Sequence, residues 1–279
     1  MRMMRGFQGY HQTVTMTETR IDGDRAPDGW DALAAELDLW AAAGRPATLW
    51  WRDDDATAPG AALDRLLELG ARHDVPVALA VIPARAQPAL ADALRGAAVL
   101  QHGWSHANHA PLGAKKCELG DDRPVEAVTA ELAEGWRRLS ALVGPALLPV
   151  LVPPWNRIAP AVSAALPGLG FRALSTDREH DAAVPGLAQV NTHLDPVDWR
   201  HGGGFLGTAA ALAGAIDHLR ARRLGTVPDR PTGLLTHHLA MDGATWDFVD
   251  RLLAVTAGHS AARWLAAPAV FAHRGGVPR

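Results

Sequence analysis

The stretch "PATLWWRDDDATAPGAALDRLLELGARHDVPVALAVIP" (residues 46–83) contains a complete strand–helix–strand unit. Its first apolar run, 46–51, is short and continuous, which is typical of a buried strand. Residues 59–74 place leucines at helical spacing, and 75–83 form a second strand-like run. Two such runs separated by a helix favour a parallel pair of strands.

The same alternation continues through the rest of the chain. A helix is predicted over 27–43, before the first strand. Further helices are predicted over 87–96, 124–143, 160–166, 205–223 and 244–257, and further strands over 97–101, 171–175, 188–194 and 232–237. Residues 146–155 are predicted to form a strand and then a proline-stiffened loop. An alternation repeated about seven times predicts a parallel α/β fold, for which a barrel and a doubly wound sheet are both open at this point.

Composition agrees with one folded α/β domain. The chain has 279 residues, of which 48% are apolar, and its net charge of −3 gives no electrostatic footprint for nucleic acid. Residues 1–25 are polar and unpatterned, so we expect a flexible extension before a single domain over 26–279. A single cysteine, no recognisable secretory signal and no apolar run near the roughly 20 residues that span a bilayer lead us to expect a cytoplasmic protein without a membrane span.

Reactive side chains follow five of the predicted strands. They are Asp53–Asp55, His102 with His106, Pro153–Arg157, Asp195 with Asp198, and His237 with His238. The carboxyl ends of parallel strands meet at one rim, where α/β proteins carry their chemistry. We therefore expect these side chains to converge.

A carboxylate beside two imidazoles is a common set of zinc ligands. Three protein ligands are typical of a catalytic zinc site, whereas structural sites use four. A second carboxylate next to the ligand would serve as a general base, and His237, from another strand, would serve as a general acid. Any one aspartate in isolation is better explained as part of a solvated turn.

Five segments carry these residues: "WRDDDA" (51–56), "HGWSH" (102–106), "VPPW" (152–155), "DPVDW" (195–199) and "LLTH" (234–237). In this order they resemble the five motifs of the polysaccharide deacetylase family (NodB homology, carbohydrate esterase family 4). That family hydrolyses N-acetyl groups of amino sugars on a distorted (β/α) barrel. The resemblance covers about residues 46–240 and implies such a barrel of about seven strands.

The first segment matches the family pattern T-F-D-D-G loosely. An ungapped alignment of the helix that follows implies that Asp54 is the base and Asp55 a metal ligand. A shift by one residue would assign these roles to Asp53 and Asp54, and the sequence leaves that alternative open.

The second segment matches the spacing of H-[ST]-x-x-H. The resemblance implies that His102 and His106 are metal ligands. Gly103 stands where the family has a hydroxyl residue.

The third segment lacks the arginine of R-x-P-[YW], which orients the base in the family. Val152 stands in its place, and the sequence leaves open whether Arg157 replaces it. The loop with Pro154 and Trp155 is implied to contact substrate, with the Trp155 backbone N–H binding the oxyanion. Arg157 is the third residue that we expect near the substrate.

The last two segments supply the acid and its surroundings. The resemblance implies that Asp198 buttresses the acid, that Trp199 walls the acetyl pocket and that His237 is the acid itself. The implied cofactor is a divalent cation, zinc first and Co²⁺, Ni²⁺ or Mn²⁺ as alternatives. The implied substrate is a carbohydrate or glycoconjugate that carries an N-acetyl group.

Three other functions remain in competition. A metal-binding barrel without catalysis would explain Val152, and a zinc amidohydrolase for a small amide would share all the chemistry. A phosphatase of the haloacid dehalogenase type would use "DDDAT" (53–57) as D-x-D-x-T. That enzyme needs a lysine, and the only lysines are Lys115 and Lys116, on a predicted loop; it also gives the histidines no role.

Overall fold

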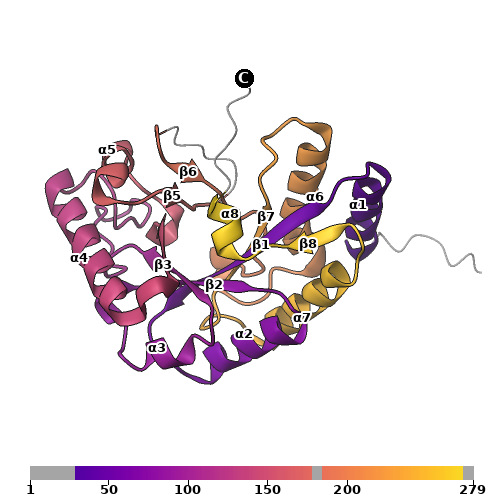
Figure 1. Ribbon diagram of the computed structural model, residues 1–279, viewed down its shortest axis with the longest axis horizontal. Coiled ribbons are helices and arrows are strands. Elements are labelled where there is room, and N and C mark those ends of the chain that lie inside the picture. The colour runs from indigo at the N-terminus through magenta and orange to yellow at the C-terminus, as the bar shows by residue number, and fades with distance from the viewer. Residues whose placement is uncertain (1–28, 178–183, 273–279) are drawn as a thin grey trace, which may run out of the picture.

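Parallel strands form one strongly curled sheet (Figure 1). The computed structural model describes residues 29–177 and 184–272, so the extension predicted over 1–25 lies outside the described residues. The strands are β1 (Ala47–Ala56), β2 (Val77–Val81), β3 (Ala98–His102), β4 (Leu147–Val152), β5 (Ala173–Leu174), β6 (Ala188–Gln189), β7 (Thr232–Thr236) and β8 (Ala262–Trp264). Their order is β6-β5-β4-β3-β2-β1-β7, and β8 also pairs with β1.

The two edges of this curled sheet meet beyond β6. Thr192 forms a parallel bridge with Asp177, and Leu194 forms one with Leu234 of β7. The segment that continues β6 therefore links β5 to β7 and closes the curl. This arrangement confirms the predicted distorted barrel and excludes the doubly wound sheet.

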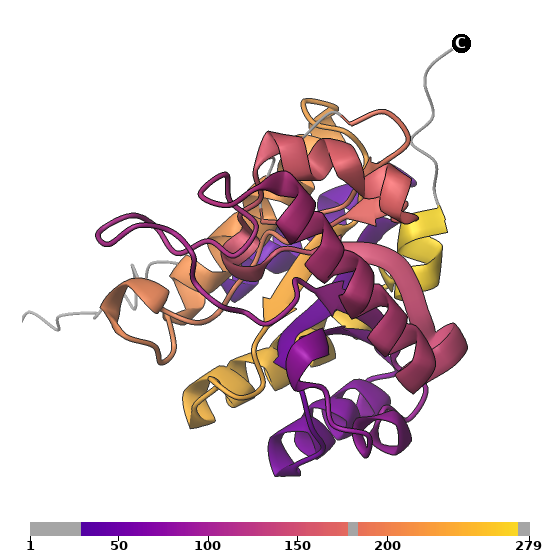
Figure 2. The same ribbon diagram turned by 90° about the vertical axis from the view of Figure 1, so that its left-hand side faces the viewer.

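Helices cover the outer face of the barrel (Figures 1 and 2). They are α1 (Trp30–Ala42), α2 (Ala61–Arg72), α3 (Leu90–Ala93), α4 (Val125–Val143), α5 (Pro160–Ala165), α6 (Thr208–Leu224) and α7 (Gly243–Ala257), whereas α8 (Ala267–Ala272) packs at one end of the barrel. None of the helices within 29–177 and 184–272 combines the length and the apolar character needed to cross a bilayer.

Alternate side chains of the strands enter two different cores. Trp51 and Leu79 face the helices, in a cluster that also holds Leu37 and Trp40 of α1. Trp50 and Leu100 point into the barrel, where α8 packs against them from one end. The side-chain period of two along a strand accounts for this division.

The structure differs from the sequence expectations at two strands, β1 and β8. β1 was expected to end at residue 51, but it continues through the three aspartates to Ala56 because Asp53 and Asp54 are buried against polar partners. Trp264 lies on β8, a strand that the sequence did not predict. That strand has three residues, too few for a period to show in the sequence.

Candidate metal centre and catalytic site

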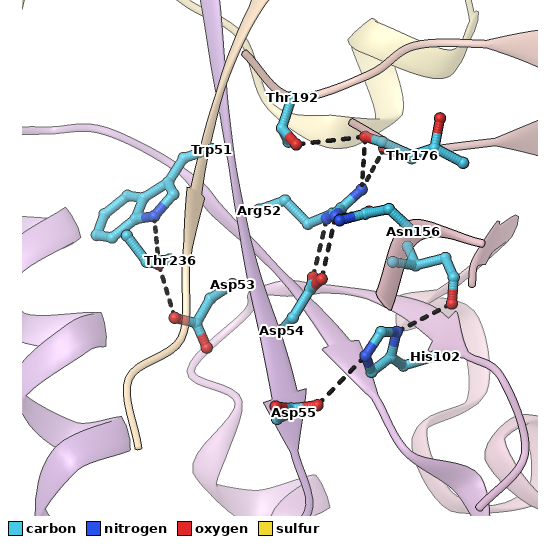
Figure 3. Close-up of polar contacts among 12 residues, drawn as sticks. Trp51, Arg52, Asp53, Asp54, Asp55, His102, Asn156, Thr176, Thr192 and Thr236 are labelled. Carbon is cyan, nitrogen blue, oxygen red and sulfur yellow. Dashed lines mark hydrogen bonds and ion pairs between the residues drawn. The ribbon is translucent and has the colours of Figure 1, made fainter. Parts of the chain in front are cut away.

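Asp55, His102 and His106 converge at the carboxyl ends of β1 and β3. Asp55 Oδ1 lies 3.2 Å from His102 Nε2 and 3.4 Å from His106 Nε2. One ligand atom from each residue lies within 4.8 Å of the other two. Figure 3 shows Asp55 and His102 facing one another across the rim.

The protonation pattern of this cluster suits a cation. His102 Nδ1 lies 2.9 Å from the Val152 carbonyl oxygen, which can only accept, so Nδ1 donates and Nε2 is the ring nitrogen that faces Asp55. Asp55 Oδ1 is buried and faces the Nε2 atoms of both imidazoles. With both rings neutral, these three acceptors repel unless a cation lies between them. The residues therefore fit a divalent metal, and an Asp–His–His set is one that zinc accepts.

Charges within the cluster favour the ligating form of the carboxylate. Burial alone would raise the pKa of Asp55, but contact with His102 and the charges of His237 and His106 outweigh it and hold that pKa well below its ordinary value. Burial lowers the pKa of His106. Both shifts keep these groups in the forms that bind metal.

Four residues at this rim have positive φ angles. Asp55, His106, Trp155 and Asn156 have φ values of 71°, 59°, 54° and 55°. This left-handed region is uncommon for residues other than glycine, and such residues cluster at functional sites where the surroundings hold them in place.

Asp54 is held by an arginine from its own strand. Arg52 Nε lies 2.8 Å from Asp54 Oδ1, and Arg52 Nη2 lies 3.0 Å from Asp54 Oδ2 (Figure 3). The remaining Arg52 N–H groups donate to Asn156 Oδ1, Ser175 Oγ and the Thr176 carbonyl. Arg52 is 0% exposed and Asp54 2%, so the pair is shielded from water.

Sequence reasoning missed Arg52. The available signal was its spacing, because residues i and i+2 of a strand share a face. Arg157 does not contact Asp54: its Nη1 donates to the Lys116 carbonyl at 2.7 Å. The arginine absent at Val152 is thus matched by one on β1.

Asp53 points to the opposite side of β1, toward β7 (Figure 3). Its carboxylate accepts hydrogen bonds from Thr236 Oγ1 at 2.6 Å and from His238 N and Nδ1 at 3.0 and 2.5 Å. Asp53 is 0% exposed. The shifted alignment needs Asp53 as the base, and the phosphatase hypothesis needs it as the nucleophile; a carboxylate enclosed by three donors suits neither role.

His237 follows β7 and packs against Trp199. The two ring centroids lie 4.8 Å apart in an edge-to-face arrangement. His237 Nδ1 is buried and has no hydrogen-bond partner among the described residues. Asp195 Oδ2 accepts a hydrogen bond from Trp199 Nε1 at 2.8 Å, and burial raises the pKa of Asp195 against the opposing charge of His237.

Asp198, the expected buttress of His237, has other partners. It caps the short 3-10 helix Trp199–His201, where its carboxylate accepts from the backbone N–H groups of Arg200 and His201. Its second oxygen lies 2.7 Å from His201 Nδ1. The capping role turns Asp198 onto its own helix, and Asp195 is the carboxylate that interacts electrostatically with His237.

The third segment forms the 3-10 turn Pro154–Asn156 beside the metal ligands. The Trp155 ring lies 4.2 Å from that of His106, and Pro154 is buried beneath it. Within the described chain the Trp155 N–H donates no hydrogen bond. It therefore remains available for a substrate oxygen, as the role in an oxyanion site requires.

Comparison with known proteins identifies this fold. Neither a protein-family profile nor a curated protein sequence matches the chain. A candidate polysaccharide deacetylase from Mycobacterium smegmatis superposes with a TM-score of 0.55 at 17% identity, over 84% of this chain and 94% of that one. A mutant of BA3943, described as a carbohydrate esterase family 4 pseudoenzyme with restored activity, gives 0.51 at 13% identity, over 81% and 68%. At these identities the likeness establishes a shared fold, that of the carbohydrate esterase family 4 deacetylases.

Proposed function

We propose that this chain is a metal-dependent hydrolase that removes an N-acetyl group from an amino sugar or glycoconjugate. The observation that carries the proposal is the approach of Asp55 Oδ1 to two imidazole nitrogens, at 3.2 and 3.4 Å, next to a second, arginine-held carboxylate. Asp55, His102 and His106 would hold the ion, with zinc the first choice and Co²⁺, Ni²⁺ or Mn²⁺ as alternatives. A divalent metal bound there would activate water near neutral pH and polarise the acyl carbonyl.

The protein's own residues supply the proton transfers. Asp54 accepts a proton from the water that attacks the acyl carbon, since each of its oxygens keeps a lone pair beyond the contact with Arg52. His237 donates a proton to the departing amine, and Asp195 is the carboxylate that interacts electrostatically with it. The Trp155 N–H binds the developing oxyanion, while the half-exposed Trp199 provides an aromatic wall for the acyl group.

A metal-binding barrel without catalysis is the main alternative. Its support is a solved structure of this fold that is described as a pseudoenzyme in its unmutated form. The absence of an arginine at Val152 carries less weight once Arg52 is seen against Asp54. A zinc amidohydrolase for a small amide uses the same residues and differs in its substrate.

Acetate release from N-acetylated chitooligosaccharides tests the proposal. Metal-free protein is assayed alone and with added Zn²⁺ or Co²⁺, and the variant Asp54→Asn is assayed beside it. We expect release that depends on metal and falls by about 10²- to 10⁴-fold in Asp54→Asn, which keeps its metal. Release that survives chelation contradicts the proposal. A bound ion with no release from any N-acetyl amino sugar supports the silent barrel or the small-amide enzyme.

A further inference from the structure

The chain between the two histidine ligands follows an irregular path. Gly103 and His106 both adopt left-handed backbone conformations, with φ of 54° and 59°. Two of the carbonyls are bonded to neighbouring elements: the Gly103 oxygen accepts from Gln101 Nε2, and the Trp104 oxygen accepts from the Ala84 N–H. The N–H groups of Trp104 and Ser105 instead point toward one shared acceptor.

That acceptor is the Glu118 carboxylate. Oε2 accepts from the Trp104 N–H at 3.1 Å, and Oε1 accepts from the Ser105 N–H at 2.7 Å and the Ser105 hydroxyl at 2.9 Å. The Ala107 N–H also approaches Oε1, at 3.4 Å. Consecutive N–H groups of a loop that surround an anion stabilise both the anion and the loop conformation.

Glu118 has no other evident reason to be buried. It is 0% exposed, and the hydrogen bonds that its carboxylate accepts within the described chain all come from Trp104, Ser105 and Ala107. A buried carboxylate is costly unless donors compensate it, and here the donors all belong to the segment 104–107. The long loop that leads from this segment through Glu118 to α4 projects from the rim (Figure 2).

Glu118 also explains Gly103. A Cβ atom at residue 103 would lie 2.1 Å from Glu118 Oε2 and 2.6 Å from Pro154 Cδ. No side chain fits there while the carboxylate is in place. The Glu118 carboxylate therefore excludes, at position 103, the hydroxyl residue that the resemblance implies.

We propose that Glu118 is a positioning residue of the metal centre, holding the segment 104–107 so that His106 Nε2 meets His102 and Asp55. This inference rests on the proposed metal site. Without the carboxylate, the N–H groups of Trp104 and Ser105 lose their acceptor, and the left-handed conformation of His106 is no longer imposed. The ligand set then forms only at a cost to metal affinity.

Cobalt binding tests this role without any assay of activity. Metal-free wild type, Glu118→Gln and the control Asp121→Asn are titrated with Co²⁺ while the visible absorption spectrum of the bound ion is recorded. Asp121 is an exposed carboxylate three residues along the same loop, so its replacement makes the same change of charge. We expect Glu118→Gln to bind about 10- to 100-fold more weakly, with an altered spectrum, because partners of metal ligands contribute on that scale. Asp121→Asn is expected to behave as the wild type.

A second variant covers the case in which Glu118→Gln does not fold. Ser105→Ala removes one hydrogen bond to Glu118 and leaves the carboxylate, and we expect a smaller loss of affinity in the same direction. Unchanged affinity and spectrum in a folded Glu118→Gln, or in Ser105→Ala where the first variant is unfolded, overturns the role of Glu118. A wild type that binds no Co²⁺ overturns the metal centre itself, which is a separate outcome.

Discussion

Arg52 and Asp54 lie on one face of β1 and form a two-point ion pair inside the barrel. Burying such a pair is costly unless every donor is satisfied, and all five Arg52 N–H groups have acceptors here. The pair fixes the orientation of Asp54 next to Asp55. A single strand therefore delivers the proposed base, its orienting cation and a proposed metal ligand to the same rim.

Replacing Arg52 by lysine should impair Asp54 as the base. Arg52→Lys keeps the charge but cannot make two parallel contacts, so Asp54 is left poorly oriented. We expect turnover to fall by about 10²-fold, within the range of general-base contributions. Acetate release from chitooligosaccharide, with metal content measured in parallel, checks this.

The matched control is Arg157→Lys. Its guanidinium bonds the Lys116 carbonyl at the surface of the loop, away from Asp54. It should retain turnover close to that of the wild type. Equal losses in the two variants would assign the orienting role elsewhere.

Variants of Asp195 and Asp198 test which of these two carboxylates assists His237, the proposed acid. Asp195→Asn keeps one acceptor, for either the Val197 N–H or Trp199 Nε1, and removes the charge beside His237. We expect kcat to fall by about 10-fold or more while KM stays near its wild-type value, because the lost charge acts on proton donation. Asp198→Asn preserves the cap of its helix and should have little effect. A larger loss in Asp198→Asn would restore the original sequence-based assignment.

A buried histidine, His218, should make the fold sensitive to acid. The rings of His193 and His218 stack with centroids 3.4 Å apart, and His218 Nδ1 lies 2.9 Å from Thr232 Oγ1. Burial, followed by the charges of His193 and Arg222, lowers the pKa of His218 to about 2. In the unfolded chain a histidine binds its proton near pH 6.5.

The sign of the effect follows from this difference. Between about pH 6.5 and 2 the unfolded chain binds a proton at His218 that the folded protein does not, so stability falls as pH falls through that window. The slope from this one group is about 1.4 kcal/mol per pH unit. His218→Gln should be less stable at pH 7 but lose stability less steeply toward pH 4, as measured by urea unfolding. Parallel pH profiles for the two proteins would contradict this origin.

The sequence predicts regular elements well where their period is long enough to show. The helix expected over 124–143 is α4, Val125–Val143, and the strand expected over 232–237 is β7, Thr232–Thr236. The short strand β8 and helix α8 were not predicted, since three to six residues carry too little periodicity.

The sequence pattern predicted only part of the candidate site. Spacing and resemblance brought Asp55, His102 and His106 together, and the structure places them within reach of one ion. The same stretch could not distinguish Asp53 from Asp54, because that choice depends on whether Thr236 and His238 or Arg52 face each carboxylate. Glu118 gave no signal either, since three of its four donors are backbone N–H groups, which every sequence has.

Anomalous diffraction from crystals grown with Zn²⁺, recorded above and below the zinc absorption edge, tests the metal centre most directly. We expect one strong anomalous peak at the carboxyl ends of β1 and β3, about 2.0–2.2 Å from Asp55 Oδ1, His102 Nε2 and His106 Nε2. A peak elsewhere, or no peak at this rim in protein saturated with zinc, would contradict this expectation.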